Sequence, residues 1–341
     1  MKTLLLLCLA VCCVGCSALN HPSCRLPGTD HVSLPAHPKP YRPEPWGTGD
    51  QAFPYSVWTP HAPRSVKAVV ILVPGWDGTM RDYEVLAEHL RAHGYAVYGS
   101  EQRTGVYDPV KSQRGNPDDW QNWVRDLQGF TAFVRHKHPG VPFYYHGHSF
   151  GTMVAAQTAA QSSGTGRPAG IILQSMAMPF LIEKENAFKG ALFGAFAWVR
   201  VPQLALGDLA KLGPTGDPTL NCQWMHSEDR LAEGYKVRYF LEAAKLGHRV
   251  WETSEKLTLP VLALEGEQDN VVAPKPADKW AYDQFLRYHL RGGRAEVIRY
   301  HDGYHTMTIP PAGNPALDRT TAKALGDITH WLDRQTSGSK R

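Results

Sequence analysis

The feature that most constrains the fold is a repeated alternation of short apolar runs with longer segments of helical periodicity. Residues 68–73 read Ala-Val-Val-Ile-Leu-Val without a polar interruption, as a strand buried on both faces of a sheet would. Similar runs predict strands at 95–100, 141–146, 170–174, 259–264 and 295–300, and helical patterns lie at 79–93, 117–138, 150–161 and 321–334. This alternation predicts an α/β fold with a mostly parallel central sheet covered by helices on both faces.

Residues 178–256 break the alternation. They contain several helical patterns and no clear strand run. The uncharged stretch between Lys189 and Arg200 is too short to cross a bilayer, which takes about 20 apolar residues. We therefore predict a helical cap at 178–256, inserted between the two parts of the core at 51–177 and 257–336.

The N-terminal residues differ from the rest of the chain. Met1-Lys2 is followed by an apolar run from Leu4 to Val14, which predicts a secretory signal peptide over residues 1–16. Cys13-Val14-Gly15-Cys16 resembles a bacterial lipobox, with Cys13 at the usual leucine position, and this resemblance implies lipidation of Cys16. We expect an exported, membrane-anchored lipoprotein of the cell envelope, with a periplasmic or secreted protein as the alternative.

Residues 17–50 are rich in proline, which fixes φ and lacks an amide donor, so we expect an extended tether. Of the six cysteines, only Cys24 and Cys222 lie beyond the leader, and the sequence leaves open whether they form a disulfide. The net charge of +4 is small, and no basic run interleaved with aromatic residues argues for nucleic-acid binding.

One motif carries nucleophile chemistry. Gly147-His148-Ser149-Phe150-Gly151 matches G-x-S-x-G and lies between a predicted strand and a predicted helix. A strand–turn–helix with this motif is typical of a nucleophile elbow, in which the turn presents the serine hydroxyl and the flanking glycines avoid clashes. Ser149 is the candidate nucleophile. The alternative is an ordinary serine in a Gly-rich turn.

A serine hydroxyl needs a base, which a carboxylate in turn orients. The order Ser, Asp, His is satisfied by Asp269 and His305, each just past a predicted strand. Catalytic groups of open α/β sheets gather at the carboxyl ends of strands. The alternatives are Glu265, Glu267 or Asp302 for the acid and His301 for the base.

An oxyanion hole needs two backbone amides. One normally follows the nucleophile, here Phe150, and the other comes from a loop after an earlier strand. Val73-Pro74-Gly75-Trp76-Asp77-Gly78 ends a buried strand, and we assign the second donor to the Trp76 amide. His146 and His148 lack a third ligand or an H-E-x-x-H pattern, so we predict neither a metal nor another cofactor.

Several segments together resemble the monoacylglycerol lipase and bacterial lysophospholipase family of α/β-hydrolases, which includes serine aminopeptidases. The resemblance covers about residues 51–331. Its anchors are Val73-Pro74-Gly75, Glu101-Gln102-Arg103-Thr104-Gly105, the Gly147–Gly151 elbow, Glu265–Val272, Tyr304-His305 and the cap segment Met225–Arg230. The resemblance implies the α/β-hydrolase fold, a triad of Ser149, Asp269 and His305, and oxyanion donors at Trp76 and Phe150. Pro74 departs from the family's usual histidine, and Thr152 follows Gly151 where a second glycine is common.

The expected activity is hydrolysis of a carboxylic ester through an acyl-enzyme, with a monoacylglycerol or lysophospholipid as substrate. The apolar cap and the membrane tether favour a lipid. The alternatives are a serine aminopeptidase for short peptides, with Glu183, Glu185, Glu228 or Asp229 binding the free amine, and a non-catalytic binding protein of the same fold. The sequence leaves the acyl length, head group, oligomeric state and physiological role open.

Overall fold

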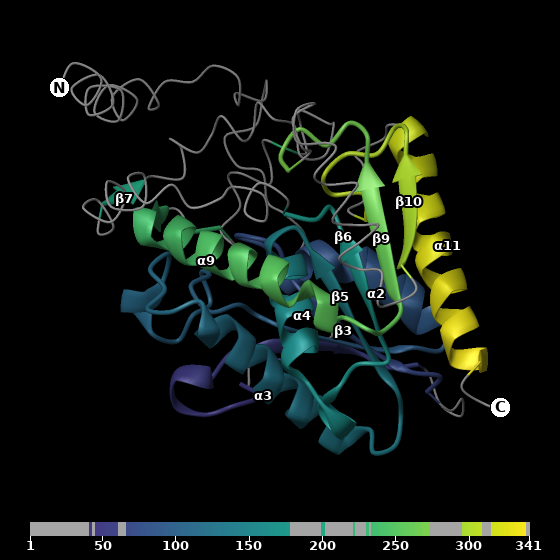
Figure 1. The fold of residues 1–341 in the computed structure, drawn as a ribbon, viewed down its shortest axis with the longest axis horizontal. Helices are drawn as coiled ribbons and strands as arrows, with labels where there is room; N and C mark the ends of the chain where they lie inside the picture. Colours follow the sequence, from purple (N-terminus) through teal and green to yellow (C-terminus); the bar gives the residue numbers. More distant parts are fainter. Residues whose placement is uncertain are drawn as a thin grey trace.

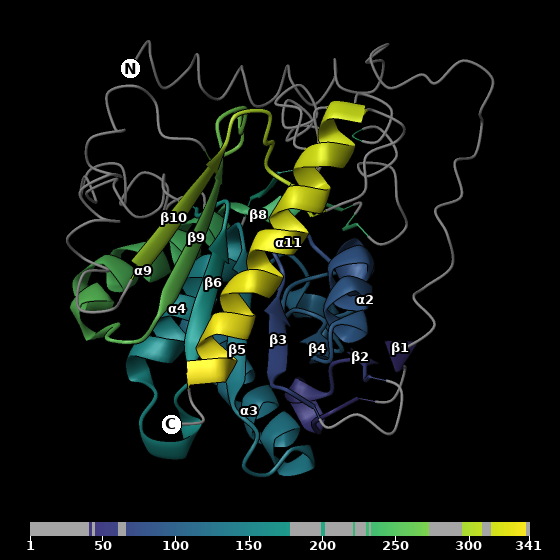
Figure 2. The ribbon, with the colours of Figure 1, turned by 90° about the vertical axis from the view of Figure 1, so that its right-hand side faces the viewer.

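The computed structural model describes residues 41–42, 45–60, 66–177, 199–201, 221, 230–231, 233–272, 295–308 and 315–338. Its centre is an eight-stranded sheet (Figure 1) in the order β1-β2-β4-β3-β5-β6-β9-β10, which can be followed in Figure 2. The six strands from β4 to β10 in this order run parallel, and β1 and β2 join the edge in antiparallel fashion. The mostly parallel α/β sheet predicted from the alternation is thus confirmed, in agreement with the α/β-hydrolase fold that the resemblance implies.

The six predicted strands all form, within two residues of their expected ends. They are β3 (Val69–Val73), β4 (Ala96–Ser100), β5 (Phe143–His148), β6 (Gly170–Gln174), β9 (Val261–Gly266) and β10 (Ala295–Tyr300). The apolar run of β3 is buried on both faces, as predicted. Val69, Ile71 and Val73 enter one core cluster, whereas Val70 and Leu72 enter the other.

Helices cover each face of the sheet. On one face lie α3 (Gln121–Lys137), α4 (Phe150–Gln161) and α9 (Val237–Thr253), whose apolar stripes meet in a single cluster. On the other face lie α2 (Glu84–Ala92), which follows the 3-10 helix η4 (Met80–Tyr83), and α11 (Pro315–Gly338). Figure 2 shows α11 crossing in front of the sheet, with α2 beside it.

The sheet begins earlier in the chain than the sequence indicated. β1 (Tyr41–Arg42) pairs with β2 (Tyr55–Trp58), and the 3-10 helix η3 (Gly49–Gln51) lies between them. The Trp46 indole donates a hydrogen bond of 2.8 Å to Ser100 Oγ and packs on Phe130. Part of the predicted tether at 17–50 therefore belongs to the core, because an indole amid the prolines gives that segment apolar surface to bury.

The predicted cap range is described only in part. Residues 199–201, 221, 230–231 and 233–256 include the short strands β7 (Arg200–Val201) and β8 (Tyr235–Lys236), which pair antiparallel, the helix α9 and the 3-10 helix η8 (Ser254–Lys256). Helix α9 packs against α4, so this part of the range covers the sheet. The leader, Cys16, Cys24 and Cys222 lie outside the described residues.

Candidate active site

Ser149 lies at the turn between β5 and α4. Its backbone adopts φ 51° and ψ −123°, a region that non-glycine residues rarely occupy. Its amide donates 2.9 Å to the carbonyl of Gln174 on the neighbouring strand β6, and its carbonyl accepts from the Thr152 amide at 2.9 Å. This sharp, strained turn between a strand and a helix has the backbone geometry expected of a nucleophile elbow.

The glycines of the motif allow helix α4 to approach the sheet. A Cβ on Gly151 would lie 2.2 Å from the Val73 carbonyl oxygen, and one on Gly147 would lie 2.6 Å from the Gly151 carbonyl oxygen. Both obstacles are backbone atoms, which cannot move aside as a flexible side chain can. Close contact between α4, β3 and β5 therefore requires glycine at both positions.

His305 and Asp269 meet at the carboxyl end of the sheet. His305 Nδ1 lies 2.9 Å from Asp269 Oδ2, and both side chains are buried. The other carboxylate oxygen accepts from the amides of Val271 and Val272 at 2.8 and 3.0 Å. Because an ionised carboxylate only accepts hydrogen bonds, Nδ1 carries the proton of a neutral His305 and Nε2 is left free to act as a base.

Burial by itself would raise the pKa of Asp269. The nearby His305 and its hydrogen bond outweigh that effect, together with the two backbone amides, so the pKa lies below its usual value. Asp269 is therefore ionised at neutral pH. An ionised carboxylate beside the ring stabilises an imidazolium when His305 takes up a proton.

The backbone of His305 is hydrogen-bonded to the elbow and to the residue that follows the neighbouring strand β6. Its carbonyl accepts hydrogen bonds from Ser175 Oγ at 2.7 Å and from His148 Nε2 at 3.0 Å. The rings of His148 and His305 lie 5.0 Å apart between centroids. These contacts bring the loop that carries His305 against the residue just before Ser149.

His148 is a neutral link rather than a base. Burial lowers the pKa of its imidazole to about 3. Since Nε2 donates to a carbonyl, Nδ1 must accept, and Tyr83 Oη donates to it over 2.9 Å. Tyr83 Oη in turn accepts from the Gly75 amide at 2.9 Å. A chain of hydrogen bonds thus runs from the loop after β3 to the backbone of His305.

The loop after β3 lies directly against Ser149. A Cβ placed on Gly75 would come within 3.1 Å of Ser149 Cβ. The Pro74 carbonyl accepts from Gln102 Nε2 at 2.9 Å, which fixes the loop from the adjacent strand. The Gly75 amide is already committed to Tyr83, so the next amide along, that of Trp76, stays the prediction for the second oxyanion donor.

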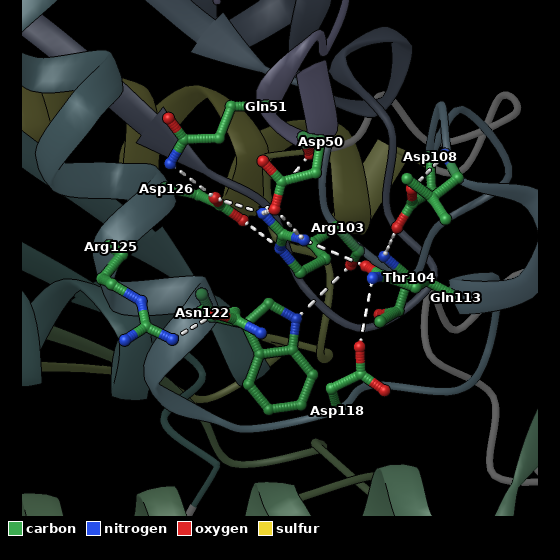
Figure 3. Close-up of polar contacts among 12 residues, drawn as sticks. Asp50, Gln51, Arg103, Thr104, Asp108, Gln113, Asp118, Asn122, Arg125 and Asp126 are labelled. Carbon is green, nitrogen blue, oxygen red and sulfur yellow. Dashed lines mark hydrogen bonds and ion pairs between the residues drawn. The ribbon is translucent and has the colours of Figure 1, made fainter. Parts of the chain in front are cut away.

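The segment after β4 explains the sequence anchor at 101–105. Arg103 is buried and donates to both Asp126 oxygens, Nε to Oδ2 at 2.6 Å and Nη2 to Oδ1 at 2.7 Å, and its Nη1 reaches Gln113 at 2.9 Å and Asp50 at 3.4 Å (Figure 3). A two-pronged contact of this kind holds a guanidinium in one orientation. Arg103 is thereby a structural anchor that places Gln102 beside Pro74.

The rival acids and base do not form this arrangement. Glu265 lies within β9, and Glu267 pairs with His301 at 3.0 Å on the surface. Asp302 is exposed. His146 and His148 are both buried, and the described parts of the chain contain no group of three or more His, Cys, Asp or Glu side chains that could hold a metal ion.

Sequence reasoning missed four residues around the site: Tyr83, Ser175, Asp77 and Arg230. Tyr83 looks like any apolar residue of an amphipathic segment, and Ser175 directly follows a strand. Arg230 ends the segment Met225–Arg230, but no local pattern in the sequence indicates which residues its side chain contacts. Their contacts join segments far apart in the chain, which local patterns do not reveal.

Comparisons with known proteins identify the family and the relatives of this chain. The profile of a family described as "Serine aminopeptidase, S33" matches residues 64–311, well over half of the chain. Human monoglyceride lipase is 24% identical over 273 residues, covering 80% of this chain and 84% of the relative. Rat monoglyceride lipase is 23% identical over 283 residues, covering 82% and 86%.

Solved structures share the fold. A soluble variant of monoglyceride lipase from Saccharomyces cerevisiae, in complex with a substrate analog, superposes with a TM-score of 0.69 at 19% identity, over 91% of this chain and 99% of that one. A thermostable carboxyl esterase from Bacillus coagulans gives a TM-score of 0.65 at 17% identity, over 83% and 94%. At such identities the likeness extends to the fold alone.

Proposed function

This chain belongs to the serine aminopeptidase S33 family of α/β-hydrolases and is a serine ester hydrolase, and we propose that it cleaves monoacylglycerols or lysophospholipids through an acyl-enzyme on Ser149. The single observation that carries the proposal is the buried 2.9 Å hydrogen bond between His305 and Asp269, next to a strained serine elbow. Nucleophilic acyl transfer needs an oriented base and a positioned serine hydroxyl, and these two features supply one part each.

The proposed reaction has two halves. His305 Nε2 takes the Ser149 proton as Oγ forms a bond to the acyl carbon, and Asp269 stabilises the resulting imidazolium. The amides of Trp76 and Phe150 bind the oxyanion, and each such donor contributes roughly 3 kcal/mol. The C–O bond to the alcohol then breaks while His305 returns the proton to the leaving oxygen. Water, deprotonated by the same imidazole, then attacks the acyl carbon. The bond from that carbon to Ser149 Oγ breaks, His305 returns the proton to Oγ, and the acid is released.

The names of the relatives by sequence support a lipidic substrate. The human, rat and mouse relatives by sequence are each named monoglyceride lipase. The family description keeps an aminopeptidase as the outcome to test against. The acidic residues that would bind a free amine, Glu183, Glu185, Glu228 and Asp229, lie outside the described residues.

Export and lipid anchoring at Cys16 complete the proposal. They rest on the leader pattern of residues 1–16. In the parts of the chain that the structure describes, no helix combines the length and the apolar character needed to span a bilayer. Incorporation of labelled fatty acid into the wild-type protein, and its loss in Cys16→Ala, is the expected result. Equal labelling of both proteins would contradict this assignment.

The substrate class is tested by comparing full-length protein in detergent against a monoacylglycerol, a lysophospholipid and an aminoacyl-nitroanilide. We expect turnover of a lipid ester, and its loss in Ser149→Ala. Ser162→Ala serves as the matched control, because that hydroxyl only caps the end of α4 through the Thr158 carbonyl. Faster cleavage of the nitroanilide than of either lipid would overturn the substrate assignment.

A further inference from the structure

The turn after β3 is interlocked with residues 230–235. Asp77 Oδ1 accepts hydrogen bonds from Tyr235 Oη at 2.7 Å and from the Leu231 amide at 3.2 Å. In the opposite direction, Arg230 Nη1 donates to the Asp77 carbonyl. Side chain and backbone of one residue in the turn are thus held by three groups from a segment about 150 positions later in the chain.

Arg230 also holds the far end of the same loop. Its guanidinium contacts Asp82 through two hydrogen bonds of 2.6 and 3.0 Å, and the Arg230 side chain is 1% exposed. Asp82 in turn accepts from the Thr79 amide at 3.0 Å in a capping box at the start of η4. One buried arginine therefore links Asp77 to the helical turn that follows it.

The backbone of this turn needs such support. The Gly78 amide donates 3.0 Å to the Gly75 carbonyl, and Asp77 has φ 56°. A positive φ at the third position defines a type II turn, where glycine is the favoured residue. A non-glycine residue at positive φ persists when its surroundings fix it, and here the fixing contacts come from Arg230, Leu231 and Tyr235.

Trp76 is held by the same segment. Its ring meets Tyr235 and Phe240 at centroid distances of 5.1 and 5.6 Å, both in edge-to-face geometry. Trp76, whose amide is the proposed oxyanion donor, therefore lies between two residues that are themselves held by hydrogen bonds, Gly75 and Asp77. Its side chain packs on β8 and α9.

We propose that Asp77 is a positioning residue that couples the oxyanion turn to residues 230–240, so that the Trp76 amide takes its catalytic orientation only when this contact is formed. The inference rests on the proposed function. Asp77 does not touch the reacting atoms. Its carboxylate is engaged by Tyr235 and Leu231, and its effect reaches the substrate through the peptide geometry of the turn.

Loss of these contacts would act on the transition state rather than on substrate binding. An oxyanion donor interacts with charge that develops during the reaction, so its displacement lowers kcat and leaves KM nearly unchanged. Removal of a whole donor costs about 100- to 1000-fold in kcat. For a displaced donor we expect a loss of roughly tenfold to hundredfold.

The test compares Asp77→Gly, Asp77→Asn and Tyr235→Phe, with Tyr95→Phe as matched control. Tyr95 also donates a 2.7 Å hydrogen bond to an aspartate, Asp333, but it directly precedes β4 and so lies at the amino end of the parallel strands, away from the site at their carboxyl ends. Asp77→Gly still permits the positive φ of the turn but removes the carboxylate that accepts from Tyr235 and Leu231. Asp77→Asn keeps an oxygen that accepts both hydrogen bonds, so its kcat should lie closer to that of wild type.

We expect Asp77→Gly and Tyr235→Phe to lower kcat at unchanged KM, and to slow fluorophosphonate labelling of Ser149 in parallel, while Tyr95→Phe changes neither. Thermal melting of each variant provides the folded fraction to which rates are normalised. A normalised kcat in both variants within twofold of wild type, or a change confined to KM, overturns the coupling. A wild-type protein that neither hydrolyses lipid esters nor reacts with fluorophosphonate overturns the proposed function instead.

Discussion

Asp77→Asn should make the protein more stable at pH 8, although it removes a negative charge near the buried Arg230. Burial raises the pKa of Asp77 from 3.8 to about 6, against the opposing effects of Arg230, Tyr235 and the Leu231 amide, and with Asp82 adding to the rise. The ionised form therefore fits the folded protein less well than the neutral form does. An asparagine resembles the neutral form in shape and keeps its acceptor.

The magnitude follows from linkage between protonation and folding. One pKa unit corresponds to about 1.4 kcal/mol, so ionised Asp77 costs the folded state about 3 kcal/mol at pH 8. Between pH 4 and 6 the folded state binds more protons at this site than the unfolded chain, so the Asp77 contribution to stability falls as pH rises through that range. The advantage of Asp77→Asn should be complete above pH 6 and shrink toward pH 4.

Urea unfolding followed by tryptophan fluorescence at pH 8 and pH 5 measures this difference. Asp333→Asn is the matched control, because Asp333 also accepts a hydrogen bond of 2.7 Å from a tyrosine hydroxyl. There Lys67 and Tyr95 outweigh burial and hold the pKa below its usual value. We expect Asp333→Asn to lose stability at pH 8. If Asp77→Asn loses stability there as well, the reasoning about a costly buried charge is refuted.

Three further predictions concern the core of the site. Asp269→Asn should lower kcat by about 10⁴-fold with the fold intact, because an amide no longer fixes the proton on His305 Nδ1; near-normal kcat in steady-state assays would contradict this. Gly151→Ala should destabilise the protein by more than about 3 kcal/mol, since the new Cβ would meet the Val73 carbonyl at 2.2 Å; an unchanged urea midpoint would be the contrary result. Stability should fall as the pH drops from 6.5 toward 4, because burial lowers the pKa of His146 to about 4 and of His148 to about 3 while the unfolded chain takes up protons on both. Replacing both histidines by glutamine should reduce the pH dependence of the unfolding free energy, measured by urea titration at several pH values. An unchanged pH dependence would show that these histidines do not cause it.

The core was predictable because its signals are local. Continuous apolar runs such as Val69–Val73 are readable as buried strands, and a glycine-flanked serine between strand and helix fixes the elbow. The order of Ser149, Asp269 and His305 along the chain then identified the residues of the acid–base pair, because topology brings strand ends to one edge.

The remainder depends on contacts that local patterns do not encode. The antiparallel edge strands β1 and β2 are short and partly polar, so they contain no apolar run from which they could be predicted. The predicted helix at 79–93 divides into η4 and α2, since Thr79 and Asp82 form a capping box around a separate turn. The contact of Arg230 with Asp77 and Asp82 joins positions far apart in sequence, and only the folded chain reveals it.

The central claim is that Ser149 attacks the acyl carbon. Mass spectrometry of peptides from protein treated with a fluorophosphonate tests it most directly, because the reagent leaves a stable adduct on an activated serine. We predict a single adduct on Ser149, absent from Ser149→Ala and greatly slowed in His305→Ala. An adduct on another residue, or undiminished ester hydrolysis by Ser149→Ala, would contradict the account.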